Sequence, residues 1–174
     1  PPSTVQLDQI IEQIKTRSLD SEESIRFEVV QEILKAIKLE HDLISIDLLN
    51  ILRDRTLDVK IKVRKFALQG LAALYKKIHS KASTSKRKTI QVVSWIPSKI
   101  MRIYFQESAE DKLLVERLLN NSIVPYNLGA REKMAQLYYA FSIFDDYSML
   151  SLAEIMKNRT IIYQLMKSII DQIE

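Results

Sequence analysis

The sequence predicts an all-α protein, an α-solenoid of antiparallel helix pairs with about eight helices. The 174 residues include only 2 Gly and 4 Pro, so few tight turns are expected. Apolar residues make up 47% of the chain and recur at steps of three and four, the period of one helical face. No run of alternating β-branched residues is bounded by hairpin turns, and a sheet is therefore not expected.

A helix pair that repeats after 38 residues organises the first half of the chain. Five residues match between the copies: Asp20, Ile25, Arg26, Val29 and Ile33 against Asp58, Val63, Arg64, Ala67 and Leu71. A helix pair that repeats at about 40 residues is typical of HEAT and armadillo solenoids. The alternative is chance similarity between two capped amphipathic helices.

A single segment is expected to hold all the helix pairs, at about 5–39, 45–79, 90–121 and 128–174. In the second pair, Asp58 precedes the second helix as a cap, because a carboxylate accepts hydrogen bonds from the first free amides. Gly70 and the two alanines at 72–73 leave room on that helix for a close neighbour. In stacked repeats, an Arg such as Arg26 commonly pairs with the turn Asp of a neighbouring unit, so Asp20, Asp58, Arg26 and Arg64 are expected to be architectural.

The second half follows a polar, basic loop at 80–89, which is expected to be mobile. Pro97 predicts a kink or a break just before it in the pattern of 90–106. Ser108 is expected to cap the next helix, in which Leu113, Leu114, Val115, Leu118 and Leu119 are expected to point inward. Asp145-Asp146 is expected to separate the last two helices.

The composition gives little support for catalysis, and the protein is expected not to be an enzyme. It has 2 His and 0 Cys, without an H-E-x-x-H spacing, a Gly-rich phosphate loop or a G-x-S-x-G elbow. No metal or cofactor is expected. No apolar run approaches the roughly 18–20 residues of a membrane span, so no membrane partner is expected. The chain begins at Pro1 and stops within a helical pattern, which indicates a segment of a longer protein.

The net charge of +4 is unevenly distributed. Between Arg53 and Lys88 the chain has twelve Lys and Arg residues and two acidic residues, so the remainder is acidic. This basic band would attract an acidic peptide, an inositol phosphate or a nucleic acid. A solvated helix face followed by a loop is the alternative interpretation.

Several irregular motifs read together resemble a known family. They are RDRTLDVKIKVRKFALQGLAALYKK, VSWIPSKIMRIYFQESAEDKLLVERLL, VPYNL and MAQLYYAF. In this order they resemble the cohesin-associated regulators of the precocious-dissociation-of-sisters family, which are long HEAT-repeat proteins. The resemblance covers about 18–144, and 145–174 continues it more loosely.

The resemblance implies a nuclear, non-enzymatic scaffold that regulates sister chromatid cohesion. Family members bind the kleisin subunit of cohesin, and a Wapl-type releasing factor would act elsewhere on the full protein. A kleisin segment would lie across a groove lined by the second helices. The candidate contacts are Lys65, Tyr75, Lys76, Lys77, Trp95, Tyr104, Gln106, Asp111, Lys112 and Glu116. A nucleic-acid or inositol-phosphate surface on the basic band and a purely structural spacer are the alternatives.

Overall fold

The computed structural model describes residues 4–39, 45–80, 87–106 and 108–173. These residues form helices and turns and no strand, which confirms the all-α prediction. They divide into two compact units, residues 1–92 and 93–174. None of the described helices combines the length and the apolar character that crossing a membrane requires.

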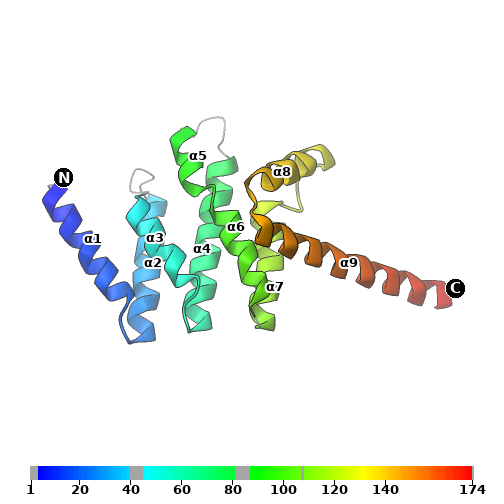
Figure 1. The fold of residues 1–174 in the computed structure, drawn as a ribbon, viewed down its shortest axis with the longest axis horizontal. Helices are drawn as coiled ribbons and strands as arrows, with labels where there is room; N and C mark the ends of the chain where they lie inside the picture. The colour runs from blue at the N-terminus through cyan, green and yellow to red at the C-terminus, as the bar shows by residue number, and fades with distance from the viewer. Residues whose placement is uncertain (1–3, 40–44, 81–86, 107, 174) are drawn as a thin grey trace. The chain divides into compact units, whose positions relative to one another are not determined.

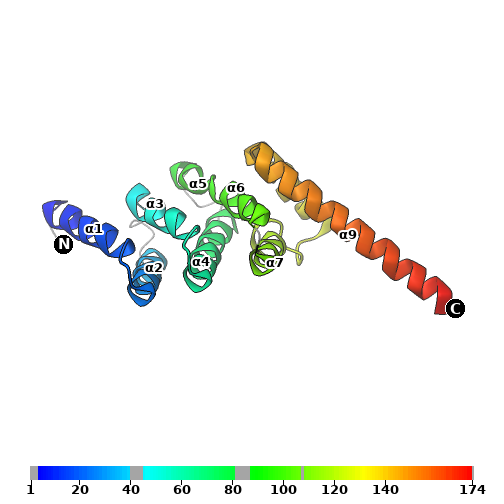
Figure 2. The ribbon, with the colours of Figure 1, turned by 60° about the horizontal axis from the view of Figure 1, so that its bottom comes forward.

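The first unit consists of two helix pairs. Its helices are α1 (Thr4–Ser18), α2 (Glu23–Leu39), α3 (Ile46–Arg55) and α4 (Ile61–Ser80), and α5 (Arg87–Val93) ends at the boundary between the units. Within this unit α1 and α3 form one layer, and α2 and α4 lie side by side in the other (Figures 1 and 2). The arrangement is that of two stacked repeats.

The core of the first unit lies between α2, α3 and α4. Its fully buried members include Val30, Ile37, Leu49, Leu52, Val63, Ala67, Leu68, Leu71, Ala72 and Tyr75. Gly70 brings α4 against α2, because a Cβ at that position would lie within 3.0 Å of Leu34 side-chain atoms. The expectation of a close neighbour at Gly70 is therefore confirmed. Ala72 is buried, whereas Ala73 is exposed.

The 38-residue repeat is visible in the hydrogen bonds of two turns. At the first turn, the Asp20 carboxylate accepts from the Arg17 side chain and from the Glu22 amide, and Arg26 donates to the Asp20 and Ser21 carbonyls. Every one of these bonds recurs 38 residues later, among Arg55, Asp58, Val59, Lys60 and Arg64. Chance similarity between two amphipathic helices would not reproduce the same polar bonds. The turn is therefore a repeated structural unit.

The second unit is built around α6 (Ile96–Arg102), which packs against the other helices of the unit. It is followed by the 3₁₀ turn η2 (Ile103–Phe105), α7 (Ala109–Leu118), the π-helical turn η3 (Leu119–Ile123), α8 (Ala130–Ile143) and α9 (Asp146–Ile173). Its fully buried side chains include Ile96, Ile100, Met101, Ile103, Val115, Leu119, Ile123 and Ile155.

The structure tests three of the predictions made from the sequence between residues 80 and 113. The break before Pro97 is confirmed, because α5 ends at Val93 and Pro97 lies in the first turn of α6. The loop expected at 80–89 is wrong at its two ends, since α4 continues to Ser80 and α5 begins at Arg87; residues 81–86 lie outside the described residues. The inward orientation expected for Leu113 is wrong, because this side chain is 55% exposed.

Polar contacts hold the end of α8 and the beginning of α9 against α6. Ser98 donates to the Ile143 carbonyl at 3.0 Å, and Ser148 donates to the Ser98 carbonyl at 3.1 Å. Arg102 pairs with Asp145 at 2.6 Å, just before α9 begins. The far half of α9 extends away from the other helices of this unit, as Figure 2 shows, and residues 160–172 are exposed throughout.

Candidate partner-binding surface

The ten predicted contact residues fall into both units. The first unit holds Lys65, Tyr75, Lys76 and Lys77, and the second holds Trp95, Tyr104, Gln106, Asp111, Lys112 and Glu116. Each unit therefore carries its own set of predicted contact residues.

In the first unit the candidates lie on α4, which carries five Lys and Arg residues and no acidic residue. Lys65 and Lys76 are exposed and lie three turns apart on one face of the helix. Lys77 is half-buried. Tyr75 is 1% exposed, and its ring packs 4.4 Å from the His79 ring. The lysines can therefore reach a partner, whereas Tyr75 belongs to the core.

Burial lowers the pKa of His79, which lies in the last turn of α4. The imidazole is therefore mostly neutral at neutral pH. The positive charge at this end of α4 comes from the Lys76 and Lys77 ammonium groups.

In the second unit, Tyr104 is held in place from several sides. It is 5% exposed, and its hydroxyl accepts a hydrogen bond from Asn158 of α9 at 3.2 Å. The Lys112 ammonium lies 5.9 Å from the centre of the Tyr104 ring, within range of a cation–π interaction. Phe105 packs edge-on against the same ring at 6.2 Å. Tyr104 thus positions an exposed lysine and an exposed phenylalanine.

Asp111 and Trp95 also contribute more to structure than to the surface. Asp111 is 1% exposed, and its amide donates to the Ser108 hydroxyl at 3.3 Å, so the capping role predicted for Ser108 is confirmed. Trp95 is half-buried and directly precedes α6. Of the six candidates in this unit, Gln106 and Lys112 are exposed and Glu116 is half-buried.

Two exposed apolar residues lie beside these candidates. Phe105 is 52% exposed and Leu113 is 55% exposed. Sequence reasoning did not propose either as a contact, although on the α7 helical wheel Leu113 is turned by about 100° from Leu114 and about 140° from Leu118. We call the set Phe105, Gln106, Lys112, Leu113 and Glu116 the α7 surface.

The α7 surface combines one aromatic side chain, one aliphatic side chain and opposite charges. Such a mixture suits a peptide that buries apolar anchors and pairs its charges at the rim. The Lys112 and Glu116 side chains share one face of α7, four residues apart. The arrangement favours recognition of a peptide rather than a reaction.

Comparison with known proteins places the chain in a family. The family model described as "Sister chromatid cohesion protein PDS5 protein" matches residues 2–174. The chain is 39% identical to "Sister chromatid cohesion protein PDS5 homolog B" of Gallus gallus over 165 residues, which is 95% of this chain and 12% of that protein. It is 38% identical to "Sister chromatid cohesion protein PDS5 homolog A" of Homo sapiens over 164 residues, again 12% of that protein.

A solved structure has a similar fold. It is described as "Structure of the Pds5-Scc1 complex and implications for cohesin function", and a chain in it matches with a TM-score of 0.69 at 14% identity. The match covers 83% of this chain and 23% of that chain, and it supports the solenoid fold. The chain thus spans about 12% of the length of the curated relatives named above. The family match over nearly the whole sequence shows that the chain belongs to the PDS5 family of sister chromatid cohesion proteins.

Proposed function

We propose that this chain is part of a nuclear, non-enzymatic scaffold that regulates sister chromatid cohesion by binding the kleisin subunit of cohesin. Membership of the PDS5 family carries the proposal. A Pds5 protein of similar fold has been solved with Scc1 as its partner. A Wapl-type releasing factor would bind elsewhere on the full-length protein.

The α7 surface is the part of the chain best suited to a kleisin segment. Phe105 and Leu113 offer apolar area that the described residues leave open, and Lys112 and Glu116 add charges of both signs. The buried Tyr104 ring orders two of these side chains, because Lys112 and Phe105 both pack against it. A surface that is already ordered loses less conformational entropy when a peptide binds.

Binding to kleisin peptides tests the proposal. Fluorescein-labelled peptides that tile the N-terminal portion of the cognate kleisin are titrated with the chain, and binding is followed by fluorescence anisotropy. Phe105→Ala and Leu113→Ala should each weaken binding of the preferred peptide at least tenfold, since both remove anchors. Lys112→Glu should weaken it through charge and should alter its salt dependence.

The control is Lys157→Glu, which reverses the charge of an exposed lysine on α9. It should leave the affinity unchanged, and circular dichroism should show the same helix content for all variants. Unchanged affinity in Phe105→Ala, Leu113→Ala and Lys112→Glu together would contradict the use of the α7 surface.

The charge of α4 favours a second candidate, a surface for nucleic acid or inositol phosphate. Lys62, Lys65 and Lys76 are exposed on this helix, which has no acidic residue. Binding of a DNA duplex with a steep salt dependence, weakened by Lys65→Glu and Lys76→Glu, would support it. If neither kleisin peptides nor polyanions bind, the chain serves as a structural spacer.

A further inference from the structure

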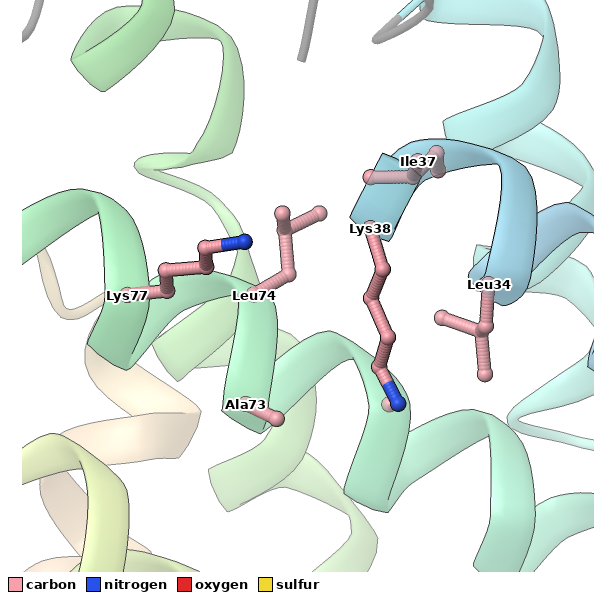
Figure 3. A pocket seen from close by; sticks show the side chains of 7 residues that line it. Leu34, Ile37, Lys38, Ala73, Leu74 and Lys77 are labelled. Carbon is pink, nitrogen blue, oxygen red and sulfur yellow. The ribbon is translucent and has the colours of Figure 1, made fainter. Parts of the chain in front are cut away.

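The first unit contains an apolar pocket between the C-terminal halves of α2 and α4. It is lined by Leu34, Ile37, Lys38, Gly70, Ala73, Leu74 and Lys77. Figure 3 shows the labelled side chains of the two helices around it. Its volume is about 240 Å³. An apolar cavity of about 150 Å³ can hold a benzene ring, so this pocket has room for one large apolar side chain.

Small residues on α4 create the pocket. Gly70 allows α4 to approach Leu34 closely, and the following residue on the same side is the small Ala73. Leu34, Ile37 and Leu74 are each less than 10% exposed and form the apolar lining. A hollow of this kind is a suitable receptor for the anchor residue of a peptide.

The charged residues of the pocket are both lysines. Lys38 lies in the last turn of α2 and Lys77 in the last turn of α4. In the part of the chain that the structure describes, neither ammonium group pairs with a carboxylate. Lys76 adds a third cation beside the pocket. The partner that complements this pocket therefore has an apolar anchor and acidic neighbours.

We propose that this pocket docks an acidic peptide segment of a partner protein through one large apolar side chain. The anchor enters between α2 and α4, and its acidic neighbours pair with Lys38 and Lys77. The pocket lies in the first unit and the α7 surface in the second, so the proposal is independent of kleisin binding there.

A designed peptide tests the pocket directly. The probe is a fluorescein-labelled peptide with one Phe flanked by three Asp on each side, titrated with the whole chain. The comparison peptides replace Phe by Ala, or every Asp by Lys. We expect the Phe peptide to bind at least tenfold more tightly than the Ala peptide, and the Lys peptide not to bind. Equal binding of the Phe and Ala peptides would overturn the proposal.

Two kinds of variant separate the anchor from the charges. Ala73→Leu fills the pocket from an exposed helical position. It should lower the affinity for the Phe peptide at least tenfold and leave the unfolding temperature unchanged. The double variant Lys38→Gln, Lys77→Gln should lower the affinity for the Phe peptide and reduce the salt dependence of its binding. The matched control Lys60→Gln removes an exposed charge outside the pocket and should change neither.

Inorganic tripolyphosphate distinguishes a peptide from a free phosphate. It should compete for the two lysines but should bind Ala73→Leu as tightly as the unmodified chain. Undiminished binding of the Phe peptide to Ala73→Leu would overturn the proposal, because the anchor would then lie elsewhere. Kleisin peptides should bind Ala73→Leu as tightly as they bind the unmodified chain. If Ala73→Leu lost affinity for the kleisin peptides as well as for the Phe peptide, the two sites would not be independent.

Discussion

Arg26 of α2 and Asp58 of the turn between α3 and α4 form a buried bidentate ion pair. The Arg26 Nε and Nη2 atoms donate to the two oxygens of the Asp58 carboxylate at 2.8 and 2.9 Å. Arg26 is 9% exposed and Asp58 is 4% exposed. The pair joins one repeat to the next, as the sequence pattern predicted for these residues.

Breaking this pair should destabilise the first unit strongly. Asp58→Ala leaves the Arg26 charge buried without its carboxylate partner, which costs about 3–5 kcal/mol. Arg26→Ala should cost less, because Asp58 keeps its ion pair with Arg55 at 3.0 Å. The double variant should cost clearly less than the sum of the single variants. Urea denaturation gives the free energies of unfolding. Additive costs would show that the two residues act independently. As a control, Lys15→Ala removes the exposed pair with Glu12 and should have little effect.

Asp58 should also make the chain sensitive to acid. Burial alone would raise the pKa of Asp58, but hydrogen bonds from Arg26 and the Lys60 amide outweigh it and lower the pKa. The unfolded chain then binds more protons, so the stabilisation is complete above the unfolded pKa of about 3.9 and is lost as the pH falls through the folded value. The stability difference between the unmodified chain and Asp58→Asn should therefore shrink as the pH falls below about 4. A constant difference would rule out this linkage.

His79 should make the free energy of unfolding depend on pH in a second, higher range. Its pKa is lowered by burial, so the folded state favours the neutral ring, and this stabilisation is lost as the pH falls from about 6.5 towards the folded value. His79→Gln should flatten the change in unfolding free energy between pH 7.5 and 5.5. His41→Gln tests the other histidine, which lies outside the described residues. An equal slope in His79→Gln and the unmodified chain would contradict the prediction.

Gly70 should be coupled to Leu34. In Gly70→Ala the new Cβ meets the Leu34 side chain, and overpacking of this kind costs about 1–3 kcal/mol. In a Leu34→Ala background the clash is absent. The same substitution should then stabilise the chain by about 0.5–1 kcal/mol through helix propensity. Thermal or urea unfolding of the four proteins measures the coupling. If Gly70→Ala has the same effect in both backgrounds, Leu34 does not restrict this position.

The two halves of α9 should differ in amide hydrogen exchange. The first half packs on α6, and among the described residues the last side-chain bonds from α9 to other elements are those of Asn158 and Arg159, to Tyr104 and Asn120. Residues 160–172 are exposed, so local opening should be easy there. Exchange measured by mass spectrometry should be at least tenfold faster in 160–172 than in 146–157. Equal protection at all protein concentrations would contradict this difference.

The sequence predicted the repeat because its polar turn residues recur at a fixed spacing. Asp58 and Arg64 make the same local hydrogen bonds as Asp20 and Arg26. The residue types that repeat in the sequence are therefore the ones whose hydrogen bonds repeat in the structure. Pro97 likewise marked a boundary, because its ring cannot continue a helix from the preceding turn. Local chemistry determines these features, and a single sequence therefore reveals them.

The candidate surface was predicted less well, because exposure depends on packing between distant segments. Tyr75 and Tyr104 are among the predicted contacts, yet they are only 1% and 5% exposed, and Tyr104 is held by Asn158, far away along the chain. Leu113 was expected inside and is exposed. A helical period of 3.6 residues shows which residues share a face, but it does not show which face a neighbour covers.

The positions of the Arg26–Asp58 pair and of the pocket have a mechanical consequence for the first unit. The pair fastens the turn before α4 to the beginning of α2, and farther along the two helices meet again where Gly70 lies against Leu34, beside the hollow. Loss of the ion pair would therefore release the turn before α4, while the contact between Gly70 and Leu34 would still hold the two helices together.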